Sequence, residues 1–270
     1  MYPDVLRQHI QKCKKATDKP FGVNIPLLYP NVDDHLKIII EEKVSIVFTS
    51  AGNPEKYTSF LQENGITVAH VIANKKFALK CLKAGVDVIV AEGFEAGGHN
   101  GIEEITTMCL IPLIREIIDI PLVAAGGISS GKSMLAAMIL GADGVQIGSR
   151  FAASNESSAH ENFKQEIINA NEGDTELTLK ELTPVRMMKN KFYDTIQEAY
   201  ANNATKEQLA ILLGKGRAKR GMFEGDLING ELEIGQISAH INNIKPVSEI
   251  MSELVQEYNF ALSNINDYKI

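Results

Sequence analysis

One histidine stands in a loop that is otherwise nearly bare of side chains, AEGFEAGGHNG (91–101). An imidazole can be a core residue, a metal ligand, or an acid and base that transfers protons near neutral pH. A metal site is disfavoured because no His or Cys lies at ligand spacing from His99. A core position is disfavoured because a glycine-rich loop is not an apolar face. We therefore predict that His99 lines a catalytic site that holds no metal.

Two further loops carry paired glycine and hydroxyl residues, in PLVAAGGISSGKSM (121–134) and GADGVQIGSRF (141–151). Glycines let the backbone approach an oxyanion closely, and a helix that starts after them offers unpaired N–H groups. The pairs Gly126–Gly127 and Gly148–Ser149 therefore predict a phosphate-binding cradle. The alternative is that these glycines only make tight turns between strands and helices.

Three polar side chains in or after apolar segments are weaker candidates. Asn24 is an amide within GVNIP (22–26) and needs a partner, which is either a ligand or the neighbouring backbone. Glu92, at the end of an apolar segment, is interpreted as a hydrogen-bond partner of a cofactor. Glu95 is interpreted as a solvated loop charge.

Short β-branched segments alternate with amphipathic ones over the first two thirds of the chain, which is typical of parallel strands joined by crossover helices. Their nearly continuous apolar character fits strands covered on both faces. Because glycine and polar residues gather after five of these strands, we predict an α/β fold, a (β/α)8 TIM barrel, over an open doubly wound sheet. The predicted strands are 21–25, 45–51, 67–72, 87–93, 121–127 and 144–149.

Six strands are fewer than the eight of a closed barrel, so the expectation is that the first two lie upstream of Met1. The chain starts instead in a predicted helix with Pro3 in its first turn and Leu6, Ile10 and Cys13 on one face. We predict two parts, a barrel portion at 1–151 and a helical segment at 152–270 that packs on it. No strong strand is predicted in the helical segment.

Composition excludes several classes of protein. A formal net charge of −7 offers no basic surface for nucleic acids or anionic membranes. No apolar run reaches the roughly 18 residues of a membrane span, and the polar N-terminus lacks the apolar core of a signal peptide. The three cysteines form no C-x-x-C pair, which argues against disulfides and zinc. We predict a globular, cytoplasmic protein.

Several stretches are recognisable when taken together, in chain order. They are GVNIP, AEGFEAGGHNG, VAAGGI (123–128), GVQIGSRF (144–151), PVRMMKNKF (184–192) and EGDLINGELEIGQISAHI (224–241). The chain in these stretches resembles the flavin-dependent nitronate monooxygenase superfamily, which also contains the FMN-dependent enoyl-acyl-carrier-protein reductases. The last two stretches resemble the helical segment of that superfamily. The superfamily's first two glycine-rich strands have no counterpart in this sequence.

The resemblance implies a barrel that binds FMN non-covalently at its mouth. His99 would be the acid and base beside the flavin ring. The residues that would contact the flavin are Asn24, Glu92, Gly97 and Gly127, and those that would hold its phosphate end are Gln146, Gly148 and Ser149.

The resemblance leaves two reactions open. The first expectation is reduction of a trans-2-enoyl group on acyl carrier protein, with NADH or NADPH as co-substrate, and the second is oxidation of a small alkyl nitronate with O2. A different class is a truncated, catalytically silent barrel that binds a phosphorylated ligand or a partner chain. The basic residues at 186–191 and 215–220 either meet phosphates of the carrier arm or the nicotinamide cofactor, or form a solvated helix surface. The sequence leaves a homodimer open.

Overall fold

The computed structural model describes residues 2–265. The chain divides into two compact units. The first contains the residues up to Ala91 together with Leu113–Val123, and the second contains Glu92–Pro112 and the residues from Ala124 onward. Within the described residues, no helix combines the length and the apolar composition that a membrane span needs.

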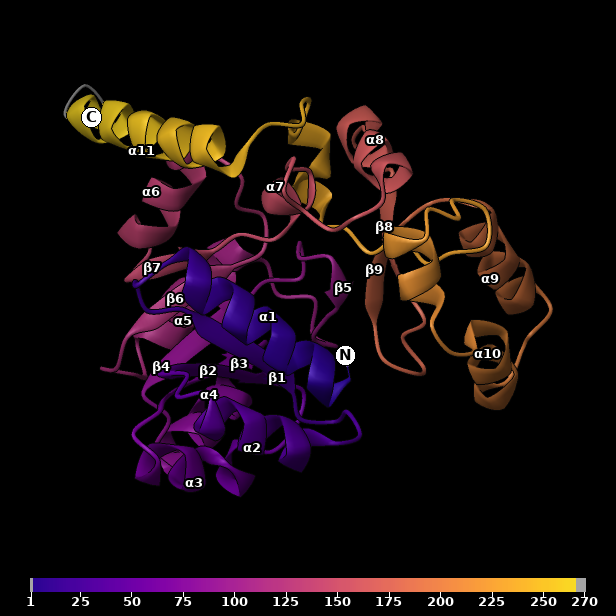
Figure 1. The fold of residues 1–270 in the computed structure, drawn as a ribbon. Helices are drawn as coiled ribbons and strands as arrows, with labels where there is room; N and C mark the ends of the chain where they lie inside the picture. Colours follow the sequence, from indigo (N-terminus) through magenta and orange to yellow (C-terminus); the bar gives the residue numbers. More distant parts are fainter. Residues whose placement is uncertain (1, 266–270) are drawn as a thin grey trace. The chain divides into compact units, whose positions relative to one another are not determined.

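All six predicted strands form, and they build one sheet in which each strand pairs with the next in chain order (Figure 1). The pairs β1–β2, β2–β3 and β3–β4 are parallel. Val47, Val68 and Ile89 in the middle of the sheet are fully buried, as their continuous apolar character predicted. The predicted α/β fold with parallel strands of the TIM-barrel type is confirmed. The bounds are β1 Gly22–Pro26, β2 Ile46–Ser50, β3 Thr67–Ile72, β4 Val88–Glu92, β6 Leu122–Ala125 and β7 Gly144–Gln146.

In the first unit, helices alternate with β1 to β4. The helix at the start of the chain begins at Pro3 and buries Leu6 and Ile10, as predicted. A later helix begins where the Asn74 side chain accepts a hydrogen bond from the Phe77 N–H. The bounds are α1 Pro3–Ala16, α2 Val32–Glu41, the 3₁₀ turn η1 Pro54–Lys56, α3 Thr58–Glu63 and α4 Lys75–Ala84.

In the second unit, the segment after residue 151 combines several helices with two strands. Its last helix, α11, packs against α6 (Figure 1), and the Glu257 carboxylate accepts a hydrogen bond of 2.8 Å from the N–H of Gly131, the first residue of α6. The bounds are α6 Gly131–Ile139, α7 Ser149–Ala152, α8 Glu161–Asn169, α9 Lys191–Ala201, α10 Lys206–Leu213, the π-helical turn η2 Lys219–Phe223, the 3₁₀ turn η3 Gln236–His240 and α11 Val247–Ser263. Helix α5, Thr107–Arg115, begins in this unit.

The second unit also contains a small antiparallel sheet that the sequence analysis missed. Its order is β5-β9-β8, with β5 Gly98–His99, β8 Thr175–Thr178 and β9 Val185–Met188. The stretch PVRMMKNKF therefore begins as a strand, and helix follows only at Lys191, after the Asn190 cap. The stretch 224–241 is mostly turns. Every residue of β9 is buried, so the strand lacks the alternation that marks half-exposed strands in a sequence.

Candidate active site

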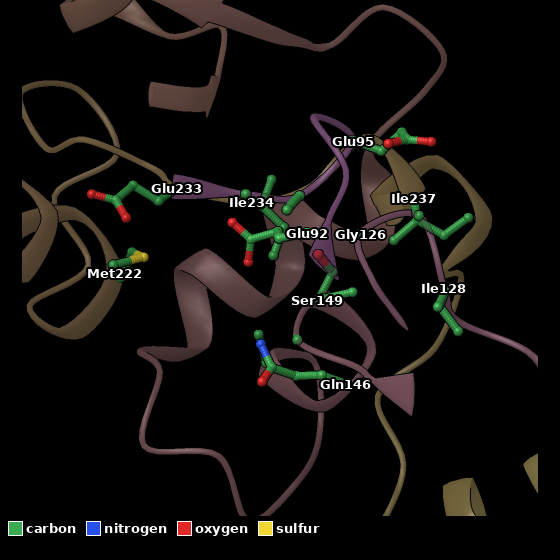
Figure 2. Close-up of a pocket in the computed structure, with 16 residues that line it drawn as sticks. Glu92, Glu95, Gly126, Ile128, Gln146, Ser149, Met222, Glu233, Ile234 and Ile237 are labelled. Atoms are coloured by element: carbon green, nitrogen blue, oxygen red, sulfur yellow. The ribbon is translucent and has the colours of Figure 1, made fainter. Parts of the chain in front are cut away.

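A pocket of about 340 Å³ lies in the second unit, at the carboxyl ends of β4, β6 and β7 (Figure 2). Its remaining wall comes from α7, from η2, and from η3 with the segment that precedes it. The lining residues are Glu92, Glu95, Ala96, Gly97, Ala125, Gly126, Gly127, Ile128, Gln146, Gly148, Ser149, Ala152, Met222, Glu233, Ile234 and Ile237. Seven of the nine predicted site residues are in this set, and the other two are Asn24 and His99.

Close backbone approach or a positive φ explains three of the four glycines among the lining residues. A Cβ on Gly97 would lie 2.4 Å from the carbonyl carbon of Ile234, so the loop after β4 packs directly on the opposite wall. Gly126 and Gly127 have φ angles of 93° and 69°, which side chains disfavour. Gly148 differs, because a Cβ there would meet nothing within 4 Å. Its lack of a side chain leaves open space in the pocket.

The two glycine-containing strand ends present free backbone donors to this pocket. Among residues 2–265, the N–H groups of Gly127, Gly148 and Ser149 donate to no protein acceptor. No Lys or Arg is among the lining residues. The Ser149 hydroxyl oxygen already accepts a hydrogen bond of 3.1 Å from the Gly235 N–H, which ties α7 to the opposite wall. A phosphate here would be held by backbone N–H groups, and the phosphate cradle is compatible with this geometry.

Two carboxyl groups of the pocket are shifted by burial. Burial raises the pKa of Glu92 to about 7. Within the described part of the chain its carboxylate has no hydrogen-bond partner. Burial also raises the pKa of Glu233, and the charge of His99 opposes that shift. A carboxyl group that is partly protonated near neutral pH can both donate and accept, which suits a polar ligand edge.

Glu95 is not the solvated loop charge that the sequence suggested. Its two carboxylate oxygens accept hydrogen bonds of 3.0 and 2.9 Å from the Thr107 N–H at the start of α5. The Thr107 hydroxyl lies 2.9 Å from the Gly126 carbonyl oxygen and 3.2 Å from that of Ala125. Thr107, which sequence reasoning missed, therefore joins the loop after β4 to the loop after β6. A threonine directly before an apolar helical run was the signal for it.

The structure places His99 beside the pocket. It lies on β5, opposite Val185 of β9, and its side chain is exposed. His99 does not line the pocket. Glu233 does line it, and the charge of His99 lowers the pKa of Glu233. Asn24 is exposed on β1 in the first unit. The catalytic role of His99 and the flavin contact of Asn24 stay predictions.

The basic residues considered for phosphate recognition are largely used within the protein. Arg186 is 2% exposed, and its Nε donates to the Phe94 carbonyl oxygen at 3.0 Å. Arg217 donates to the carbonyl oxygens of Leu213 and Asn229. Arg186 is therefore not part of a solvated surface, whereas Arg217 is half-buried. Their guanidinium groups hold backbone segments together.

The nitronate monooxygenase family model matches residues 1–257 of this chain. A probable nitronate monooxygenase from Staphylococcus aureus is 32% identical over 83% of this chain and 66% of its own length. A Rhodococcus jostii protein, (3aS,4S,5R,7aS)-5-hydroxy-7a-methyl-1-oxo-octahydro-1H-indene-4-carboxyl-CoA dehydrogenase, is 27% identical over 93% of this chain and 81% of its own length. The chain thus spans just under two thirds of the staphylococcal proteins that it matches.

Solved structures resemble the chain over its whole length. FabK from Thermotoga maritima is 41% identical with a TM-score of 0.92, covering 100% of this chain and 85% of that one. A nitroalkane oxidase from Streptomyces ansochromogenes is 24% identical with a TM-score of 0.81, covering 97% of this chain and 87% of that one. The second likeness shows the fold alone.

Proposed function

This chain belongs to the nitronate monooxygenase family of oxidoreductases, and from that premise we propose that it uses FMN and NADH or NADPH to reduce a trans-2-enoyl group carried on acyl carrier protein. The observation that carries the proposal is the pocket itself. It combines unpaired N–H groups at the ends of β6 and β7 with a partly protonated carboxyl group at the end of β4.

The residues present fit FMN. Gly127, Gly148 and Ser149 would hold the phosphate through their N–H groups, and the open space beside Gly148 admits it. The half-buried Glu92 carboxyl lacks a hydrogen-bond partner among residues 2–265 and would bond a polar group of the cofactor. FMN supplies hydride transfer when it is bound. These residues bind and orient the cofactor, and the apolar side chains of Ile128, Ile234 and Ile237 exclude water from it.

In this proposal His99 transfers the proton. Its imidazole would deliver a proton to the α-carbon of the substrate, or would hold the thioester carbonyl by a hydrogen bond. Its side chain is exposed, and the residue before it, Gly98, lies against the carboxylate of the pocket residue Glu233. The free thiols of Cys13, Cys81 and Cys109 are compatible with a reducing cytoplasm, which we also propose.

Sequence identity favours enoyl reduction over nitronate oxidation. The chain is 41% identical to the enoyl-acyl-carrier-protein reductase FabK and 32% identical to the probable nitronate monooxygenase of S. aureus. Nitronate oxidation is the second candidate because the family match and the curated relatives carry that name. In that reaction His99 would act as the base.

Anaerobic reduction of the FMN-loaded protein separates the two reactions. Bleaching of the flavin absorbance by NADH or NADPH, followed by recovery of the absorbance on adding an enoyl thioester, is expected for the reductase. Bleaching by propionate 3-nitronate but not by either nicotinamide nucleotide would favour nitronate oxidation over enoyl reduction. A protein that FMN neither colours nor stabilises against heat would instead support the catalytically silent barrel.

A further inference from the structure

Helix α11 carries an apolar stripe on its surface. The side chains of Met251, Val255 and Leu262 are 48%, 52% and 44% exposed, and Tyr258 among them is half-buried. Residues three and four positions apart lie on one face of a helix. The successive spacings of four, three and four residues therefore make these four side chains one continuous stripe, the α11 stripe.

The α11 stripe is separate from the face by which α11 packs on α6. That face is marked by the buried side chains of Ile250 and Leu254 and by the Glu257 carboxylate, which accepts from the Gly131 N–H. At 3.6 residues per turn, it lies about a quarter of a turn around the helix from the stripe. Among residues 2–265, α6 is the only labelled element against which α11 packs extensively (Figure 1). The described part of the chain thus leaves the stripe in contact with solvent.

The spacing along the stripe is that of a coiled-coil seam. Alternating steps of three and four residues are the spacing of positions a and d in a heptad, and two such seams pack by inserting the side chains of each helix between those of the other. A second copy of this chain presents the same seam. The stripe is therefore complementary to itself, which is what a contact with two-fold symmetry requires.

The charged residues of α11 lie away from the stripe. Its immediate flanks are uncharged, and they are Ser252, Leu254, Asn259 and Ala261. The glutamates of the helix lie on its other sides, and two of them have partners within the chain, since Glu253 pairs with Lys245 and Glu257 accepts from Gly131. Two chains that each carry a net charge of −7 can therefore meet along the stripe without bringing carboxylates together.

The same charges disfavour other occupants of the stripe. Helix α11 contains no Lys or Arg, the residues by which a surface helix binds an anionic membrane. A basic peptide would find no carboxylate on the flanks of the stripe to pair with. A second copy needs neither, because its own stripe is apolar with uncharged flanks.

We propose that the α11 stripe is the contact through which two copies of this chain form a symmetric dimer, with Val255 and Tyr258 at its centre. The proposal does not depend on the proposed reaction. Because each copy contributes only four side chains to the seam, the contact is small, and the dimer should dissociate at micromolar rather than nanomolar concentrations.

Sedimentation velocity of the full chain across the micromolar range tests the contact. The wild type should pass from monomer to dimer as its concentration rises. Val255→Glu places a carboxylate from each copy at the centre of the seam and should raise the dissociation constant of the dimer about tenfold or more. Phe260→Glu is the matched control, because Phe260 is 66% exposed on the same helix but points to the side opposite the stripe. This control should dimerise as the wild type does.

A wild type that stays monomeric throughout the micromolar range, or equal weakening by Val255→Glu and Phe260→Glu, would overturn the proposal. Binding of the wild type to phosphatidylcholine vesicles in place of self-association would overturn it in favour of a membrane. Thermal unfolding shows whether Val255→Glu is folded, and Leu262→Glu, near the end of α11, replaces it with the same expectation if it is not. Because neither flavin nor substrate enters these measurements, their outcome is independent of that of the proposed reduction.

Discussion

The carboxylate of Glu95 accepts hydrogen bonds from the backbone N–H of Thr107 through both of its oxygens, at 3.0 and 2.9 Å. A loop residue after β4 thereby caps the first turn of α5, where a negative charge is favoured by the helix dipole. The Thr107 hydroxyl extends the link to the carbonyl oxygen of Gly126. The geometry of one wall of the pocket thus depends on this pair.

Thr107→Val should loosen this wall. The substitution keeps the shape and deletes a hydroxyl that lies within hydrogen-bond distance of Glu95, Ala125 and Gly126. Losing it should lower the free energy of unfolding by about 1–3 kcal/mol, measured by urea denaturation, and should weaken FMN binding. Thr195→Val is the control, because its hydroxyl only donates to Lys191 within α9 and its loss should cost less than about 0.5 kcal/mol. Equal effects of the two variants would contradict the link.

Gly148→Ala tests the phosphate cradle without disturbing the fold. The position has φ −102°, and a Cβ there would meet nothing within 4 Å, so the free energy of unfolding should be unchanged. The methyl group would occupy space that the phosphate needs, and the Kd for FMN should rise about tenfold or more, corresponding to about 1.4 kcal/mol. An unchanged Kd for FMN would show that the phosphate does not bind beside Gly148.

Gly97→Ala provides the contrast. Its Cβ would lie 2.4 Å from the Ile234 carbonyl carbon and 2.6 Å from the Gly235 nitrogen, and neither backbone atom can yield without displacing the opposite wall. Both the melting temperature and the FMN affinity should therefore fall in this variant, measured by calorimetry and flavin titration. A stable Gly97→Ala protein with normal FMN affinity would show that the wall moves freely.

Glu92 should contribute to the pH dependence of the free energy of unfolding of the cofactor-free protein. Its folded pKa of about 7 lies above the ordinary 4.5, so its stabilising contribution is complete below pH 4.5 and is lost as the pH rises through 7. The loss amounts to at most about 3 kcal/mol. Urea denaturation should therefore show that the free energy of unfolding of Glu92→Gln increases relative to that of the wild type between pH 5 and pH 8.

His70 also contributes to the pH dependence of stability, and its contribution has to be separated from that of Glu92. Burial lowers its pKa from 6.5 to about 4, so it destabilises the fold as the pH falls through this range, opposite in sense to Glu92. Because His70 and Glu231 are present in both proteins, the difference between variant and wild type isolates Glu92. A difference independent of pH, or one that shrinks as the pH rises, would contradict the assignment.

His99→Ala should leave FMN bound and slow turnover by roughly 10² to 10⁴, the usual effect of losing a positioned proton donor. The side chain is exposed and is not a lining residue, so the fold and the flavin site do not depend on it. Steady-state rates with an enoyl thioester and NADH or NADPH measure the effect, and the exposed His9→Ala is the control. Turnover at the wild-type rate would remove His99 from the mechanism.

The sequence alone determined the strands of the parallel sheet and the glycine-bearing ends of β6 and β7. Both follow from local rules: apolar continuity marks a strand covered on two faces, and glycine pairs mark turns that side chains disfavour. Glu92 and Gln146 end β4 and β7, whose carboxyl ends lie at the pocket, whereas Gly97 and Gln146 were named from the family resemblance and not from any local rule.

Only the tertiary structure decided the rest. The sheet β5-β9-β8 pairs residues 98–99 with 185–186, and a two-residue strand leaves no periodicity to read. The burial of Arg186, the cap that Glu95 provides to Thr107, and the approach of Glu233 to Gly98 all join segments that are distant in sequence or lie in irregular turns. The sequence shows that these charged and hydroxyl side chains need hydrogen-bond partners when they are buried. Which partner each obtains depends on chain packing, which no local pattern encodes.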